Sequence, residues 1–135
     1  MNKEVLHVKP KKMLLIDGDE GIRKSLVLFF GSRHCLLHTV ENGAQALQAM
    51  DRHLYDVILC EELLPDMNGL NFFRIVDKRG YDTIKILIGW YGDNRTFADM
   101  QGKGIDFLLT KPFTGDALEA AIITLLEKKF FSQDT

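Results

Sequence analysis

Five short runs of apolar residues, separated by helical patterns, constrain the fold of this chain more than any other feature. The runs span 13–16, 35–40, 57–60, 84–88 and 105–109. Between them, apolar residues recur three and four positions apart, as they do along one face of a helix. Strands that are apolar almost throughout are typical of a parallel sheet covered on both faces. Right-handed crossovers then predict an α/β, doubly wound domain with helices on both faces of a five-stranded sheet.

The segments between the runs predict the helices and the limits of the domain. Helical spacing indicates helices over about 22–31, 46–54 and 70–80, with Gly31 as the C-terminal cap of the first and Leu54 as the last apolar position of the second. A short helix is expected over 94–101 and a last helix over about 115–130. We therefore expect one domain over 12–131, with a flexible N-terminal segment over 1–11 and a tail over 132–135.

Charge and composition exclude several classes of protein. With 17 basic and 19 acidic residues the net charge is −2, so bulk electrostatics give no support for a nucleic-acid partner. The longest apolar run, 26–30, is too short to span a bilayer, and the N-terminus lacks the apolar stretch of a secretory signal. Cys35 and Cys60 follow no metal-binding or disulfide pattern. We expect a cytoplasmic protein that binds neither membranes nor nucleic acid.

Polar residues and a glycine close the predicted strands at the positions where this architecture binds ligands. In open α/β sheets, ligands lie at the carboxyl ends of the strands. Asp17, Glu61 and Gly89 each come directly after a run, and Lys111 follows the last run after one intervening residue, Thr110. Carboxylates are ligands for Mg²⁺, and a lysine ammonium is a point-charge partner for a carboxylate or a phosphoryl oxygen. These four positions form the candidate site.

Three segments, in order and at matching distances, resemble a known family. Residues 14–23 resemble its opening strand and helix, 55–70 the stretch with its phosphate-accepting aspartate, and 104–113 its last strand with a Lys-Pro dipeptide. From about Lys12 to Leu126 the chain is similar to bacterial response-regulator receiver domains (CheY-like). The resemblance implies a flavodoxin-like strand order of 2-1-3-4-5. It also implies a cis peptide bond between Lys111 and Pro112, as this family usually builds it.

The sequence departs from the receiver pattern at the residues that take up phosphate. Receivers carry two adjacent acids after the first strand, but here Asp17 is followed by Gly18, where the family supplies a direct Mg²⁺ ligand. Glu61 occupies the position of the phospho-accepting aspartate, and Gly89 that of a Ser or Thr whose hydroxyl binds the phosphoryl group. Asp17 and Glu61 remain as metal ligands for a weak Mg²⁺ site, or none, and no cofactor is expected to be required.

The resemblance also assigns roles around the pocket. Trp90 stands where receivers have a small residue, and it could cover the pocket or contact a partner. Leu108 occupies the position of the switch aromatic, while Phe107 should face the other side of the sheet. Arg23 is expected to face solvent. Receivers commonly bind partners through their fourth helix, fifth strand and fifth helix, and the interface candidates here are Trp90, Phe97, Leu108 and Ile123.

These observations predict a degenerate receiver, or pseudo-receiver. It would serve two-component (phosphorelay) signal transduction through protein contacts, without phosphorylation and without enzymatic activity. Glu61 facing Lys111 would either mimic the phosphorylated state or form an ordinary ion pair, and the sequence leaves both open. The expected partner is a histidine kinase, a downstream effector or a second copy in a homodimer. Two alternatives stand beside this hypothesis: a conventional phosphorylated response regulator, and a haloacid-dehalogenase-type phosphatase suggested by Asp17-Gly18-Asp19.

Overall fold

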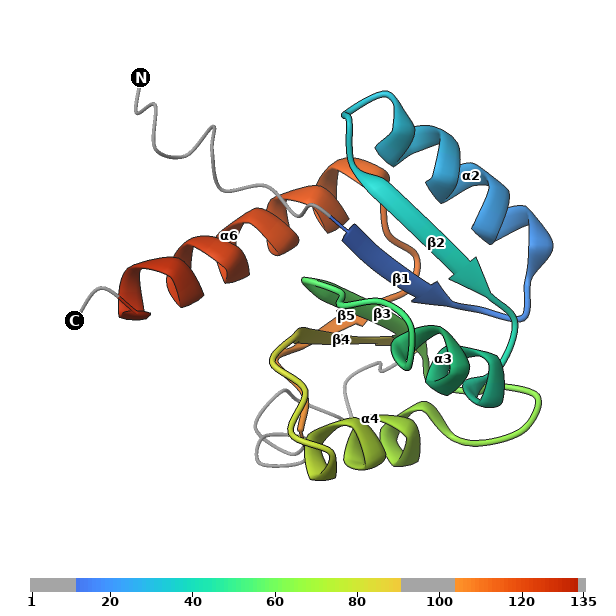
Figure 1. The fold of residues 1–135 in the computed structure, drawn as a ribbon. Helices are drawn as coiled ribbons and strands as arrows, with labels where there is room; N and C mark the ends of the chain where they lie inside the picture. The colour runs from blue at the N-terminus through green and yellow to red at the C-terminus, as the bar shows by residue number, and fades with distance from the viewer. Residues whose placement is uncertain (1–11, 91–103, 134–135) are drawn as a thin grey trace, which may run out of the picture.

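A parallel β-sheet forms the centre of the molecule. The computed structural model describes residues 12–90 and 104–133. Its five strands lie in the order β2-β1-β3-β4-β5 (Figure 1). They are β1 (Lys12–Ile16), β2 (Leu36–Val40), β3 (Val57–Glu61), β4 (Ile84–Gly89) and β5 (Phe107–Thr110). The predicted strand order is confirmed, and every carboxyl end lies on the same edge because all four strand pairings are parallel.

Helices cover both faces of the sheet, as predicted. The helices α2 (Glu20–Gly31) and α6 (Gly115–Gln133) lie on one face, and α3 (Gly43–Met50) and α4 (Gly69–Lys78) on the other (Figure 1). Each face has its own apolar core, one containing Leu26, Phe30, Leu118 and Ile122 and the other Ala46, Met50, Phe72 and Phe73. Phe107 packs against the first core and Leu108 against the second, which confirms that these neighbours point to opposite faces.

Three loops at the carboxyl edge turn directly into helices because each supplies a side chain that caps the helix. The carboxylate of Asp19 accepts a hydrogen bond from the backbone N–H of Ile22 at the start of α2. The amide oxygens of Asn42 and Asn68 do the same for α3 and α4. Such caps satisfy N–H groups that have no partner within the first turn. These three loops are therefore anchored where they meet α2, α3 and α4.

The structure corrects several boundaries. The helix α3 ends at Met50, so Leu54 lies outside it and is 84% exposed. Gly31 is the last residue of α2, Ser32 is the cap, and His34 takes the left-handed conformation with φ 60°. The last helix continues through Gln133, beyond the boundary expected at 131, and β5 begins at Phe107. The helix expected over 94–101 and the segment 1–11 lie outside the described residues.

Within the described part of the chain, no helix combines the length and the apolar character needed to cross a bilayer. The last helix is the longest described, but charged residues are spread along it.

Candidate functional site at the carboxyl edge of the sheet

The structure brings the four predicted strand-end residues to one edge. Asp17 follows β1, Glu61 and Gly89 are the last residues of β3 and β4, and Lys111 follows Thr110 at the end of β5. The backbone N–H of Lys111 donates to the carbonyl of Gly89 over 2.8 Å, which extends the pairing of β4 and β5 to the lysine. The peptide bond between Lys111 and Pro112 is cis, as predicted. This extension of the sheet pairing fixes the backbone of Lys111 beside the end of β4.

Glu61 and Lys111 form the central contact of the site. Lys111 Nζ lies 2.8 Å from Glu61 Oε1, and the two side chains are only 15% and 13% exposed. A charge-assisted hydrogen bond of this kind is stronger than one between neutral groups. The second carboxylate oxygen of Glu61, Oε2, is buried and has no hydrogen-bond partner among the described residues. Oε1 of Glu61 is therefore held by a hydrogen bond, whereas Oε2 accepts none from the described residues.

Charge in the pocket is unbalanced in favour of the carboxylates. Burial raises the pKa of Glu61, the hydrogen bond from Lys111 lowers it, and the nearby carboxylate of Asp17 raises it again. The net pKa lies above the ordinary value of 4.5, so one lysine does not fully compensate the burial and the second carboxylate. The sequence predicted the ion pair, but not that its net effect would disfavour the charged form of Glu61.

The loop after β1 orients Asp17 through its own backbone. Asp17 is 4% exposed, and its Oδ1 accepts a hydrogen bond from the N–H of Asp19 over 2.8 Å. Arg23 was expected to face solvent, but its side chain folds back and Nη1 donates to the carbonyl oxygen of Asp17 over 2.8 Å. The prediction for Arg23 was wrong because the first turn of α2 lies beside this loop, within reach of the guanidinium.

The family resemblance implies a binding site for Mg²⁺ at these strand ends. Mg²⁺ requires oxygen ligands in nearly octahedral geometry. Asp17 and Glu61 supply carboxylates, but one oxygen of each is already engaged, and Gly18 has no side chain. The described residues contain no group of three or more acidic, histidine or cysteine side chains able to hold a metal. The residues present do not fit the ion.

The loop after β3, in contrast, is closely supported. The carboxylate of Asp66 accepts hydrogen bonds of 2.9 Å from the N–H groups of Gly43 and Ala44 at the start of α3. Burial alone would raise the pKa of Asp66, but these amides and its own amide together lower it. A Cβ on Gly69 would collide with the carbonyl oxygen of Glu61 and would lie 2.9 Å from Leu87 Cδ1. The backbone of the loop therefore fits only glycine here.

Among the described residues at the end of β4, Ile88, Gly89 and Trp90, none carries a hydroxyl or a charged group. Gly89 is buried, and Trp90 after it is 71% exposed. Trp90 lines a cleft of about 670 Å³ between α2 and the start of α6, together with Ile22, Leu26, Phe29, Phe113 and Lys111. The indole and Lys111, the partner of Glu61, therefore line the same cleft.

The other predicted interface residues do not share one exposed surface. Phe97 lies outside the described residues. Leu108 is half-buried against the core beneath α3 and α4. Ile123 was expected to be exposed, but it is half-buried and lines a cavity of about 280 Å³ beside Arg33 and Cys35 of the α2–β2 connection. The position of Ile123 on α6 turns its side chain towards α2, which the helical spacing alone did not reveal.

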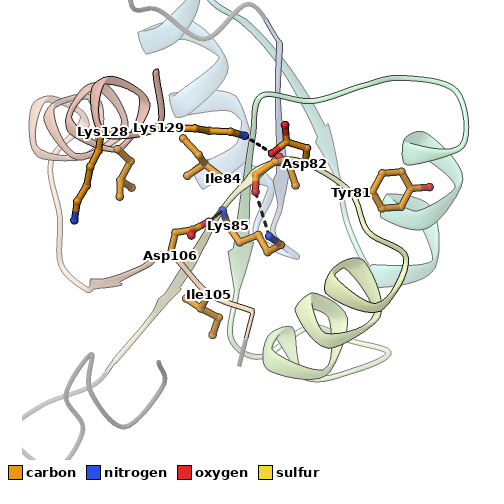
Figure 2. Close-up of a pocket in the computed structure, with 10 residues that line it drawn as sticks. Tyr81, Asp82, Ile84, Lys85, Ile105, Asp106, Lys128 and Lys129 are labelled. Carbon is orange, nitrogen blue, oxygen red and sulfur yellow. Dashed lines mark hydrogen bonds and ion pairs between the residues drawn. The ribbon is translucent and has the colours of Figure 1, made fainter. Parts of the chain in front are cut away.

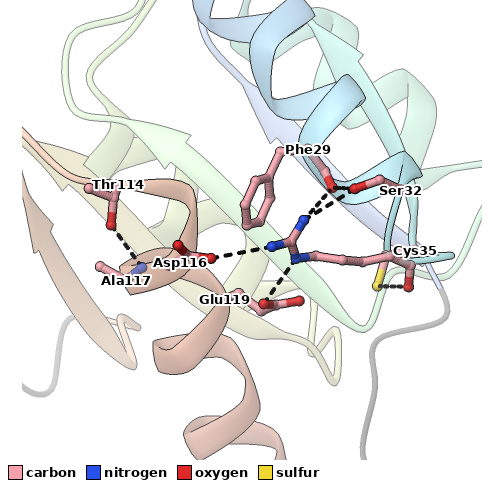
Figure 3. Close-up of polar contacts among 8 residues, drawn as sticks. Phe29, Ser32, Cys35, Thr114, Asp116, Ala117 and Glu119 are labelled. Atoms are coloured by element: carbon pink, nitrogen blue, oxygen red, sulfur yellow. Dashed lines mark hydrogen bonds and ion pairs between the residues drawn. The ribbon is translucent and has the colours of Figure 1, made fainter.

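Arg33 joins α2 to α6, a contact that sequence reasoning missed. Its guanidinium carbon lies 3.7 Å from the centre of the Phe29 ring, while Nε and Nη2 lie 3.1 and 3.3 Å from carboxylate oxygens of Glu119 and Asp116 (Figure 3). Gly115 packs so closely on the Phe29 ring that a Cβ there would lie 2.6 Å from it. The residues are about eighty positions apart in the chain, so no local pattern could have signalled the contact.

A further cavity of about 610 Å³ lies at the opposite end of the strands. Its lining includes Lys85, Asp106 and Lys129 (Figure 2). Lys129 Nζ lies 2.7 Å from Asp82 Oδ1, so the last turns of α6 are tied to the residues that precede β4. This cavity is remote from the four strand-end residues and does not belong to the candidate site.

Curated relatives are transcriptional and cell-cycle regulators. The chain is 30% identical over 120 residues to the transcriptional regulatory protein GlrR of Escherichia coli, and 31% identical over 118 residues to the cell cycle response regulator CtrA of Brucella ovis. The matches cover 89% and 87% of this chain but only 27% and 50% of the relatives. The chain thus corresponds to one part of each of these longer proteins.

Solved structures share the fold. The receiver domain of the Francisella response regulator 1452 superposes with a TM-score of 0.81 at 25% identity, covering 90% of this chain and 99% of that one. A receiver domain of a LuxO repressor-like protein from Vibrio parahaemolyticus gives a TM-score of 0.82 at 20% identity, covering 93% and 96%.

The family follows from the sequence as well as from the fold. The model of the response regulator receiver domain matches residues 13–123. This match overturns the haloacid-dehalogenase alternative, because the Asp17-Gly18-Asp19 motif lies within the receiver match and the strand order is that of a CheY-like domain. The chain belongs to the response regulator receiver domain family of two-component signalling.

Proposed function

We propose that this receiver acts in two-component signalling through protein contacts and without phosphorylation. The observation that carries the proposal is the contact of 2.8 Å between Lys111 Nζ and Glu61 Oε1. In this arrangement the lysine that would meet a phosphoryl group already holds a negative charge that is part of the chain. Glu61 thereby takes the place of the phosphorylated residue, at least towards Lys111.

The surroundings of Glu61 support the same proposal. In-line attack on a phosphodonor requires precise placement of the nucleophile, and Oε1 is occupied by the lysine while Oε2 is buried. The donor set does not fit Mg²⁺, and Gly89 offers no hydroxyl to a phosphoryl group. We therefore propose a binding module that requires no Mg²⁺ or other cofactor, and not an enzyme.

The proposed partners are proteins of the same signalling class, a histidine kinase or a downstream effector in the cytoplasm. The net charge of −2 gives no support for nucleic acid as the partner. Trp90, exposed beside the pocket, is available for contact with a partner. Aromatic residues are enriched among residues that dominate binding energy, and we propose that Trp90 is one of them.

Intact-mass spectrometry tests the proposal. The protein and a Gly18→Asp, Glu61→Asp, Gly89→Thr variant are incubated with Mg²⁺ and acetyl phosphate. The first substitution fits, because a Cβ at Gly18 would meet Pro65 at ordinary distances of 3.6 and 3.7 Å. We expect a phosphoryl adduct on the variant and none on the natural protein.

A matched control keeps the first and third substitutions and carries Glu61→Asn, which removes the carboxylate nucleophile. This control should gain no mass. A phosphoryl adduct on the natural protein would contradict the proposal and support a conventional response regulator. Peptide mapping of the adduct would then show whether Glu61 or another carboxylate carries the phosphate.

A further inference from the structure

A second cluster of titratable side chains lies between the edge strand β2 and the helix α3. His38 stands in β2 opposite Leu14 of β1, so its ring points to the face of the sheet that α3 covers. His53 and Tyr55 follow α3 on the way to β3. Their rings contact that of His38 edge to face, with centres 4.9 and 5.5 Å away. The three residues line a hollow of about 620 Å³, hereafter the β2–α3 hollow.

A hydrogen bond from Lys12 fixes the state of the His53 ring. Lys12 Nζ lies 3.3 Å from His53 Nδ1. A lysine ammonium can only donate, so Nδ1 is the accepting nitrogen of this ring. The proton of the neutral imidazole then lies on Nε2, and the nearby ammonium opposes a second proton on Nδ1. His53 therefore has one ring N–H left to donate to a ligand.

Tyr55 fixes the ring of His38 in the same way. The hydroxyl oxygen of Tyr55 lies 2.7 Å from His38 Nδ1, and the tyrosine is 6% exposed. Burial raises the pKa of Tyr55, so the hydroxyl keeps its proton, and Nδ1 is the one acceptor that the described residues offer it. Burial, and then the charges of His53 and Lys12, lower the pKa of His38 and favour its neutral form. The ring proton of His38 therefore also lies on Nε2.

The end of α3 and the turn after it bring further donors to the hollow. Gln48 and Arg52 line it, and both residues are exposed. Neither side chain has a hydrogen bond or an ion pair with another described residue. The guanidinium of Arg52 donates and cannot accept, and the amide of Gln48 carries two N–H groups. The hollow is therefore rich in donors, which suits a ligand group with several accepting oxygens.

Charge in the β2–α3 hollow is close to balanced at neutral pH. Its lining carries one basic side chain, Arg52, and one acidic side chain, Asp51. Outside the lining, Lys12 adds a positive charge, and Asp56, whose carboxylate accepts the backbone N–H of Lys12, adds a negative one. Protonation of either histidine ring would make the hollow positive. An anion should therefore bind more tightly as the pH falls.

We propose that the β2–α3 hollow binds a small oxyanion, a phosphate or carboxylate group, through the Nε2–H groups of His38 and His53 and the guanidinium of Arg52. This inference goes beyond the proposed function and does not depend on whether Glu61 accepts phosphate. The hollow shares no lining residue with the four strand-end positions of the candidate site. A bound oxyanion would join β2 to the turn after α3, and it would stabilise this edge of the sheet.

Spectra that correlate the ring nitrogens and protons of the histidines test the donors first. At about pH 7.5 we expect His38 and His53 to be neutral, with the proton on Nε2 in both rings. A proton on Nδ1 of either ring would overturn the proposal, because that ring would then present no N–H to the ligand.

Titration with sulfate and with acetate at constant ionic strength tests binding in the same spectra. We expect saturable shifts of the His38 and His53 signals with at least one of these anions, and the two series distinguish a phosphate-like from a carboxylate ligand. Sulfate keeps its charge between about pH 6 and about pH 7.5, so its dissociation constant should be at least about threefold lower at the lower pH. Shifts with neither anion, shifts that do not saturate, or equal shifts at His34, which lies outside the hollow, would overturn the proposal.

Substitutions assign the binding to the hollow. His38→Phe keeps an aromatic ring without a donor and should raise the dissociation constant of the bound anion by at least about tenfold. Arg52→Gln changes an exposed side chain, so this variant tests the proposal even if His38→Phe does not fold, and we expect a rise of at least about threefold.

His34→Asn is the matched control, since His34 has a φ of 60° that asparagine also adopts. Its dissociation constant should equal that of the natural protein. An unchanged dissociation constant for Arg52→Gln, or for a folded His38→Phe protein, would show that the anion binds elsewhere.

Discussion

The loop after β3 and the ends of β1 and β4 lie at the same edge of the sheet, but they are built in different ways. The loop is held by Asp66 on the first amides of α3 and by the close fit of Gly69 under Glu61. The strand ends bring Gly18 and Gly89 to the pocket, with no side chain to contact a ligand. The sheet at this edge thus has the strand order of a receiver, while positions 18 and 89 carry glycine.

The difference shows that the contacts that position the loop after β3 are independent of the side chains at the ends of β1 and β4. Hydrogen bonds and packing that position the loop do not involve the side chains at positions 18 and 89. Loss of those side chains therefore leaves the fold in place. The three predictions that follow separate the contribution of the loop from that of the charged pair.

The largest effect is expected from Gly69→Ala. The added Cβ would collide with the carbonyl of Glu61 and press on Leu87 and on Cys60, 3.1 Å from its Sγ. We expect the free energy of unfolding to fall by about 2–3 kcal/mol, because backbone must move to relieve the contact. Urea denaturation measures this change in the free energy of unfolding. Gly31→Ala is the control, since its Cβ would meet nothing within 4 Å, and it should be neutral or stabilising. Equal free energies of unfolding for the two variants would show that the loop backbone moves at little energetic cost.

Lys111→Met tests the charged pair. Removal of the lysine leaves the carboxylate of Glu61 buried with the carboxylate of Asp17 beside it, and the free energy of unfolding at neutral pH should fall by about 2 kcal/mol. Because the pKa of Glu61 in the folded state is above 4.5, folding favours the protonated form of this carboxyl more than the unfolded chain does. Stability linked to this group is complete below pH 4.5 and is lost as the pH rises through the folded pKa.

The defect of Lys111→Met should therefore shrink as the pH approaches 4.5, where Glu61 becomes protonated. A second substitution, Glu61→Gln, removes the charge and should restore much of the loss at neutral pH. Urea denaturation of the four proteins of this cycle at both pH values measures the coupling. A defect that does not change with pH, or no restoration by Glu61→Gln, would show that the lysine acts through packing alone.

The smallest effect is expected from Asp66→Ala. The substitution removes the acceptor of the Gly43 and Ala44 amides, and the loss should be about 1 kcal/mol, as for other helix caps. The pKa of Asp66 is lowered in the folded state, so its contribution is present above pH 3.8 and is lost as the pH falls through the folded pKa. Asp66→Asn keeps an acceptor oxygen and should lose less. A larger loss for Asp66→Ala than for Gly69→Ala would reverse the order proposed for the loop contacts.

The fold could be predicted from the sequence because the apolar runs are nearly continuous and each helix begins at a recognisable cap. The errors fall where local pattern gives no information about tertiary contacts. Leu54 continued the spacing of α3, but the chain leaves the helix at Met50. Gly31 was predicted as the C-terminal cap of the first helix, yet Ser32 is the cap and His34 adopts the left-handed conformation. In both cases the chain must turn towards the next strand, and the sequence alone does not specify where.

The sequence was enough to predict which residues form the candidate site, but not how their side chains interact. Asp17, Glu61 and Lys111 could be placed at one edge because parallel strands bring their carboxyl ends together. The buried Oε2 of Glu61 and the inward fold of Arg23 depend on side-chain orientation, which residue order does not encode. The Arg33 bridge was missed for the same reason, since it joins residues distant in sequence.

The contact between Glu61 and Lys111 also bears on how long a signal could last. A phosphoryl group on a receiver is added and later lost to hydrolysis, so its lifetime is separate from that of the polypeptide. The charge of Glu61 is encoded by the gene and persists until the molecule is degraded. Under the proposed function, the output of this receiver would be set by how much protein the cell makes and how quickly it is destroyed.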